Sequence, residues 1–192
     1  MRVDIKEEAE DNLRFIRGAM ERAERVSALS GIGGMVMGLV ALLAMAMASR
    51  FTELGDQLLI WIGSAFLAIS VGALASWLKS RKNNTSLMGD ASRRFLLCLL
   101  PAVLVGVVIT WALWPTPQVV LVPALWMMLY GCGVLASGTY AAQPIILMGG
   151  AFIVAGLFTS ALPAHWGNLL LGLAFGGLHI ACGYQVYKHH GG

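Results

Sequence analysis

A long tract without charge constrains this sequence more than any other feature. Residues 95–187 contain no Asp, Glu, Lys or Arg. A helix of about 20 apolar residues already crosses the hydrocarbon core of a bilayer, so this tract must cross a membrane several times. The whole chain of 192 residues is 58% hydrophobic and only 12% charged. We therefore predict an all-α integral membrane protein, and we exclude a nucleic-acid binder, a secreted disulfide scaffold and a soluble enzyme.

Proline-containing breaks divide the long tract into four segments. The breaks lie at Pro115 to Pro117, at 139–144 and at 162–165, and each ends a helix because proline removes a backbone donor and disfavours helix in its predecessor. Two further windows, 26–49 and 57–80, hold no charged residue except Lys79. The result is a six-transmembrane-helix bundle over residues 27–187, with predicted spans at 27–49, 57–78, 95–114, 119–137, 144–162 and 166–187.

Basic residues predict the orientation. Of the 13 Lys and Arg residues, only Arg50 lies on one side of the predicted bundle. The others are Arg2, Lys6, Arg14, Arg17, Arg22 and Arg25 in the arm, Lys79, Arg81, Lys82, Arg93 and Arg94 around the second loop, and Lys188 in the tail. By the positive-inside rule we predict a bacterial inner-membrane protein with both termini cytoplasmic, including the tail 188–192.

The arm before the first span, residues 1–26, is predicted to be an amphipathic cytoplasmic helix. Leu13, Ile16, Met20 and Ala23 recur at helical spacing within 4–26. The simplest interpretation is a solvated helix that leads into the first span. The alternatives are contact with a second copy of the chain or with a cytoplasmic protein through residues 4–26.

Small residues recur every four positions in three of the predicted spans. Such rows allow helix backbones to approach closely, which matters in lipid. The rows are Ser30, Gly34 and Gly38; Gly72 and Ser76; and Gly172 and Gly176. The sequence does not tell whether these contacts lie within one chain, although ordinary bundle packing is favoured. Residues 33–39 also loosely resemble 149–157, but glycine-rich apolar helices match by chance, and this likeness does not support transport by inverted repeats.

No Asp, Glu, Lys or Arg lies inside a predicted span away from its ends. Proton-coupled transporters and voltage sensors depend on such residues, so these mechanisms are disfavoured. His179 is the imidazole deepest in a span. An intramembrane histidine needs a partner, which makes it a functional candidate.

Three cysteines lie at similar depth to His179. Thiolates and imidazole suit zinc or Cu(I), so Cys98, Cys132, Cys182 and His179 form a candidate set of metal ligands. Against it, cysteine is an ordinary small core residue, and no CxxC or HxxxH pair is present. We predict no cofactor. Haem is disfavoured because no other span offers a histidine for an opposite axial ligand.

An intramembrane hydrolase is also disfavoured. Six-span rhomboid-type proteases pair a serine on the fourth span with a histidine on the sixth, as Ser137 and His179 could. Such a serine follows a Gly-x pair near the outer side, whereas Ser137 follows Leu135-Ala136 near the inner end.

Several short motifs resemble a group of small bacterial six-span membrane proteins. They are Leu13-Arg14-Phe15-Ile16-Arg17, Met20-Glu21-Arg22-Ala23, Gly33-Gly34 and Gly176-Gly177-Leu178-His179. The resemblance implies the fold and brings no activity with it. In size alone the chain is also similar to small urea and amide channels.

Three hypotheses for function follow. The first is a channel or facilitator for a small neutral solute, with His179, Tyr130 and Ser137 as pore-lining groups. The second is a non-transporting partner or sensor that acts through the N-terminal helix. The third is a membrane protein that binds metal through its thiols and His179. A nucleic-acid partner is not expected.

Overall fold

The computed structural model describes residues 10–16, 30–82, 90–138 and 143–190, and within these ranges it contains helices and no strands. Six helical segments of this part are long and apolar enough to cross a membrane. The first five are α2 (Gly31–Ala48), α3 (Leu54–Lys82), α4 (Asp90–Leu113), α5 (Val122–Ala136), which the short turn η1 (Pro117–Leu121) precedes, and α6 (Gln143–Ser160). The sixth helix is the continuous run of η3 (Ala164–Trp166), α7 (Gly167–Gly172), η4 (Leu173–Leu178) and α8 (His179–His190). The all-α six-helix prediction is confirmed.

The helix ends differ from the predicted spans mainly on the side of the basic residues. α3 continues to Lys82 and α4 already begins at Asp90. Charged side chains do not end a helix once it leaves the hydrocarbon, because long basic side chains extend into the interface. Arg81 illustrates this, since its guanidinium carbon lies 4.4 Å from the centroid of the Trp77 ring. Hydropathy therefore locates the lipid-embedded part of each helix and misses the extension beyond it.

The N-terminal arm is described only over residues 10–16, which are helical and exposed. On this exposed helix, Arg14 Nη1 lies 3.9 Å from Asp11 Oδ1. The remainder of the predicted 4–26 helix lies outside the described residues.

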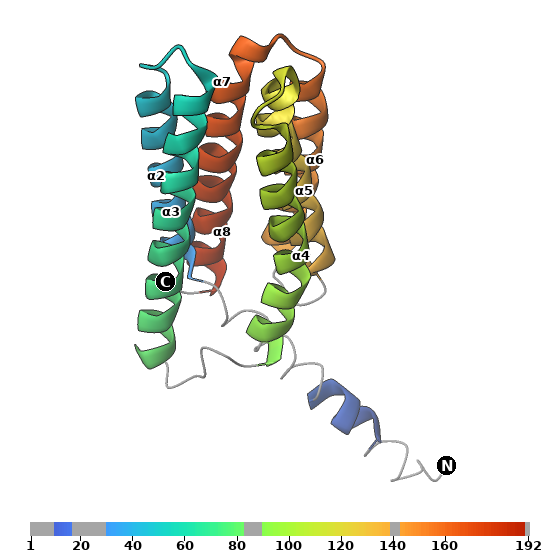
Figure 1. Ribbon diagram of the computed structural model, residues 1–192. Coiled ribbons are helices and arrows are strands. Elements are labelled where there is room, and N and C mark those ends of the chain that lie inside the picture. The colour runs from blue at the N-terminus through green and yellow to red at the C-terminus, as the bar shows by residue number, and fades with distance from the viewer. Residues whose placement is uncertain (1–9, 17–29, 83–89, 139–142, 191–192) are drawn as a thin grey trace, which may run out of the picture.

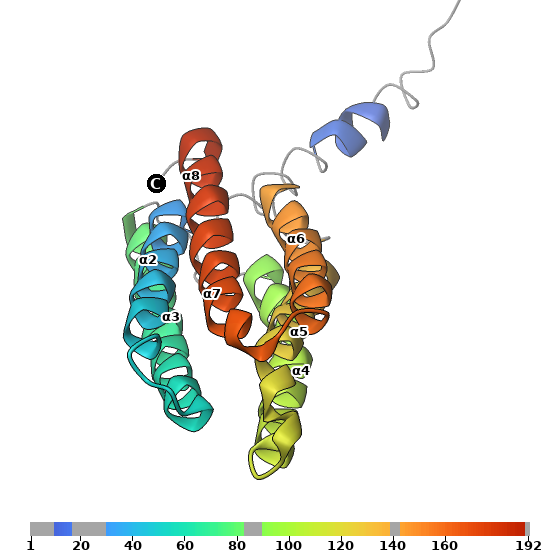
Figure 2. The same ribbon diagram turned by 90° about the horizontal axis from the view of Figure 1, so that it is seen from above.

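The six helices form two halves of three helices each. In the first half, α2 packs on both α3 and α8; in the second half, α5 packs on both α4 and α6. The sixth helix thus packs against α2, the first helix of the bundle. It also contacts α5 and α6 along a seam between the halves. Figures 1 and 2 show the two groups side by side.

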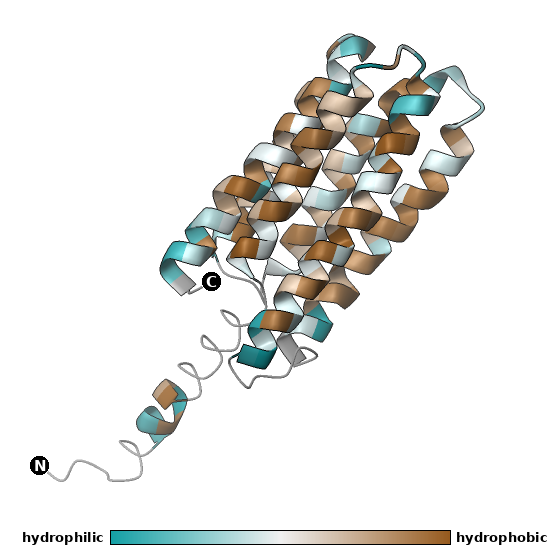
Figure 3. Ribbon diagram, turned by 90° about the vertical axis from the view of Figure 1, so that its left-hand side faces the viewer, coloured by the Kyte–Doolittle hydropathy of each residue, from teal (hydrophilic) through white to brown (hydrophobic). Residues whose placement is uncertain are grey.

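The outer surface of the bundle fits a lipid environment. Only 6% of the span in α3 and 11% of the span in α4 is buried inside the protein. Large apolar side chains such as Phe66 and Val108 are exposed there. Figure 3 shows mostly apolar residues along the helices and hydrophilic ones toward the ends of the bundle. The protein is therefore a membrane protein, with lipid as the solvent of these faces.

Glycines bring α2 into backbone contact with η4 and α8 of the sixth helix. A Cβ atom on Gly38 would lie 2.6 Å from the Gly176 carbonyl oxygen, and one on Gly34 would lie 3.3 Å from the Gly183 Cα. The predicted small-residue rows therefore meet within one chain at these positions. Ser30 has another role, because its hydroxyl oxygen accepts a hydrogen bond from the Gly33 amide and caps α2.

Side-chain hydrogen bonds hold each half together. In the first half, the Trp61 indole donates to Asn168 Oδ1 (2.9 Å), and Asn168 Nδ2 donates to the Met45 carbonyl (3.2 Å). In the second half, the Trp126 indole donates to the Thr110 hydroxyl (2.9 Å). Each hydrogen bond joins different helices of the same half, so these bonds stabilise the packing within each half.

Candidate functional site

The structure brings two of the three predicted polar residues into contact. Tyr130 of α5 and His179 at the start of α8 are hydrogen-bonded, with 2.8 Å between Tyr130 Oη and His179 Nε2. This contact, here called the Tyr130–His179 pair, lies on the seam and joins the two halves. Ser137 lies elsewhere, because its hydroxyl donates to the Gly133 carbonyl of its own helix (2.7 Å) and the residue is completely buried.

The hydrogen bonds of His179 define its tautomer. Its Nδ1 lies 2.8 Å from the Phe175 carbonyl oxygen. A carbonyl can only accept, so Nδ1 carries the proton. Nε2 of a neutral imidazole is then an acceptor, and the Tyr130 hydroxyl donates to it. Burial of His179 disfavours a charged imidazolium, so the pair is a neutral donor–acceptor contact in which both ring nitrogens have partners.

The backbone before His179 is unusual. Leu173–Leu178 forms a π-helical turn inside the sixth helix, and the His179 amide donates to the Gly176 carbonyl. In a regular α-helix that amide would bond to the Phe175 carbonyl. Here the Phe175 carbonyl accepts the imidazole proton instead. Wide turns of this kind are rare and often occur at functional sites.

Aromatic rings enclose the Tyr130–His179 pair. The rings of Tyr130, Phe152, Phe175 and His179 all contact one another, with centroid distances from 4.7 Å (Phe152 to Phe175) to 5.9 Å (Phe175 to His179). Phe152 is completely buried, and only 7% of the His179 surface is exposed. These four residues, the aromatic cluster, come from three helices of both halves and fill the seam.

The four predicted metal ligands are not gathered into a site. Within the described ranges, which include all four residues, no group of three or more His, Cys, Asp or Glu is placed to hold a metal ion. Cys182 is buried in the core, Cys98 is half-buried and Cys132 is exposed. Equal depth in the membrane did not bring them together, because the helices present these side chains in different directions. In the described part of the chain these four side chains therefore form no common group.

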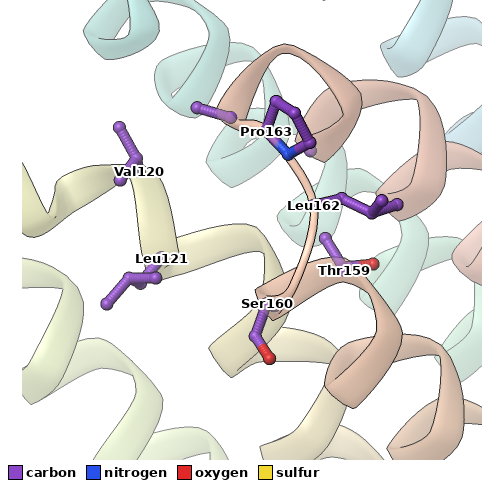
Figure 4. A pocket seen from close by; sticks show the side chains of 9 residues that line it. Val120, Leu121, Thr159, Ser160, Leu162 and Pro163 are labelled. Carbon is purple, nitrogen blue, oxygen red and sulfur yellow. The ribbon is translucent and has the colours of Figure 1, made fainter.

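A small hollow of about 40 Å³ lies near the η1 end of the bundle, between η1, the end of α6 and η3. Figure 4 shows Thr159 and Ser160 beside Leu162 and Pro163 there. Both hydroxyls are already engaged, since Thr159 donates to the Ala155 carbonyl and Ser160 to the Leu157 carbonyl. The hollow thus offers no free side-chain donor to a ligand, and it does not include the Tyr130–His179 pair.

A comparison with protein-family models, curated proteins and solved structures finds no match to this chain. The site must therefore be interpreted from its own geometry. Sequence reasoning found Tyr130 and His179 as polar residues in apolar spans, but it missed Phe152 and Phe175. The sequence indicates Phe175 only by its position, one helical turn before His179.

Proposed function

We propose that this membrane protein is a facilitator for small neutral solutes, which it handles at the Tyr130–His179 pair. The observation that carries the proposal is the neutral hydrogen bond between the two halves, buried among aromatic rings. Polar side chains inside a membrane bundle are concentrated where function requires them.

The chemistry of the pair indicates the class of solute. When the halves separate at this point, Tyr130 presents a hydroxyl donor and His179 presents the Nε2 acceptor. A solute with both an acceptor and an N–H or O–H donor can replace the lost hydrogen bond by bridging them. An ion would find no opposite charge on these two residues, which disfavours ion transport. Urea and glycerol have the required groups.

The flux experiment uses the purified chain in liposomes, with urea and glycerol as probes. We expect at least one of them to enter faster than into protein-free liposomes. The Tyr130→Phe/His179→Phe double variant should return the rate to the protein-free level, because the bridge is lost. Ser70→Ala is the matched control, since the Ser70 hydroxyl is exposed on α3 and bonds to its own helix. Wild-type flux at background for both probes, or full flux in the double variant, would contradict the proposal.

We also propose an inner-membrane location with both termini in the cytoplasm, on the strength of the basic residues around the α3–α4 connection. Alkaline phosphatase fused after Arg50 should be active, whereas the same enzyme fused after Lys188 should be inactive. A fluorescent protein that folds only in the cytoplasm should give the opposite pattern. Activity of the Lys188 phosphatase fusion would overturn this orientation.

A second candidate function uses the N-terminal arm. Leu13, Phe15 and Ile16 are 66%, 71% and 52% exposed, and such side chains favour contact with a cytoplasmic protein. Deletion of residues 1–25 separates the two candidates. A facilitator keeps its flux after this deletion, whereas a non-transporting partner has no flux to lose and loses its complex.

A further inference from the structure

We infer that the bundle contains two inverted copies of one helix pair, and that the halves expose the Tyr130–His179 pair to the two membrane faces in turn. The inference deepens the proposed function, because it makes the protein a carrier with alternating access instead of an open pore. Its solute class rests on that proposal, but the conformational claim does not.

The two helix pairs are α2 with the sixth helix (η4 and α8) and α5 with α6, and the same contact occurs at the centre of each. A Cβ atom on Gly38 would lie 2.6 Å from the Gly176 oxygen and 2.7 Å from Ile180 Cγ1. A Cβ atom on Gly131 would lie 2.7 Å from the Gly149 oxygen and 2.8 Å from Ile153 Cγ1. In both pairs a glycine thus meets the carbonyl of a second glycine and the isoleucine one turn beyond it.

The equivalence continues at the next contact along each pair. A Cβ atom on Gly183 would lie 2.7 Å from the Gly31 oxygen and 2.7 Å from the Met35 nitrogen. One on Gly156 would lie 2.9 Å from the Ala124 oxygen and 3.0 Å from the Met128 nitrogen. These positions have the same spacing from the central glycines in both pairs. The two helix pairs therefore correspond at both contacts, in the same register.

The correspondence aligns two sequence segments. Gly176-Gly177-Leu178-His179-Ile180-Ala181-Cys182-Gly183 matches Gly149-Gly150-Ala151-Phe152-Ile153-Val154-Ala155-Gly156. The alignment differs from the loose likeness between residues 33–39 and 149–157 that the sequence alone offered. It pairs the sixth helix with α6 and α2 with α5.

The equivalent residues His179 and Phe152 meet on the seam. Their ring centroids are 5.6 Å apart. Met37 occupies the position in α2 that Tyr130 occupies in α5, so each copy contributes one member of the Tyr130–His179 pair, and the positions equivalent to that pair are Met37 and Phe152. The aromatic cluster thus lies where the two copies face each other.

The copies run in opposite directions through the bundle. In Figure 1, α2 rises while α5 descends, and α8 descends while α6 rises. Inverted units related in this way give a transporter two comparable conformations, each open to a different face. Close glycine contacts hold α2 to α8 and α5 to α6, whereas side-chain rings and the Tyr130–His179 hydrogen bond lie between the halves. Motion of the halves as rigid bodies therefore concentrates at the seam.

The experiment measures distances between spin labels by pulsed electron paramagnetic resonance in liposomes, after the three native cysteines are replaced by serine or alanine. One label pair, Lys82→Cys with Arg93→Cys, reports on the end that carries the α3–α4 connection. The other pair, Thr52→Cys with Gln118→Cys, reports on the opposite end. We expect two distance populations at each end. The Tyr130→Phe/His179→Phe change should increase the fraction of molecules with the longer distance at one end and decrease that fraction at the other end.

Each outcome decides one proposal. A single distance at both ends, unchanged by the double substitution, overturns alternating access; if urea or glycerol still enters, the protein is a pore. Simultaneous widening of both ends overturns it as well. Reciprocal populations without flux of either probe support the carrier mechanism and contradict the proposed solute class.

Discussion

Replacement of Gly183 by alanine is expected to destabilise the bundle by about 3 kcal/mol, because overpacking at a rigid contact has a cost of this order. The added Cβ would meet backbone atoms of α2, the Gly31 oxygen and the Met35 nitrogen, both at 2.7 Å. Backbone atoms cannot rotate away as a side chain does, so α2 and α8 must move apart. The measurement is unfolding of the purified chain in mixed micelles with increasing sodium dodecyl sulfate, followed by tryptophan fluorescence.

Gly177→Ala is the matched control in the same sixth helix, in η4. Nothing lies within 4 Å of a Cβ atom at Gly177, so the substitution should be neutral or should stabilise the helix by up to about 1 kcal/mol. The second helix pair supplies the same comparison, with Gly156→Ala destabilising and Gly150→Ala harmless. Equal stability of the Gly183 and Gly177 variants would show that the close approach of α2 and α8 does not exist in solution.

Much of this fold was predictable because lipid simplifies the problem. A segment without charge in a bilayer must be helical, and the breaks at 115–117, 139–144 and 162–165 separate the segments, so composition and breaks predicted the number of long helices; Pro101, in contrast, lies inside α4. Pro117 begins η1, and Pro123 lies in the first turn of α5, where its missing amide hydrogen is not needed. The unpredicted extension of α3 to Lys82 lies beyond the hydrophobic window.

The arrangement of the helices was not predictable in the same way. The rows with Gly38 and Gly176 were visible in the sequence, but Gly183 and Gly31 were missed, because four-residue spacing does not say which rows face each other. The cysteines illustrate the same limit, since similar depth along a helix does not say in which direction Cys98 or Cys132 points, and the first is half-buried and the second exposed. Long-range pairing, and with it the aromatic cluster, required the structure.

Substitutions in the Tyr130–His179 pair distinguish an effect on the free energy of unfolding from an effect on transport. Tyr130→Phe leaves His179 Nε2 buried without a donor, and His179→Phe leaves the tyrosine hydroxyl without its acceptor. Each single variant should lose about 1 kcal/mol, since hydrogen bonds between membrane helices contribute roughly this much and an unpaired buried group is unfavourable. The double variant should recover the part of that loss that comes from the group left unpaired in each single variant, because replacement of both partners by apolar groups is nearly neutral; the Phe175 carbonyl still loses its imidazole donor.

Unfolding in the same micelles measures the cycle, and it makes the flux result interpretable. A double variant as stable as the wild-type chain, yet without urea or glycerol flux, would place the loss in the chemistry of the pair and not in a damaged fold. Additive losses in the two single variants would show instead that the Tyr130 hydroxyl and the imidazole do not depend on each other. In that case the seam would be held by its rings, because Phe152 and Phe175 contact both residues and would remain in place.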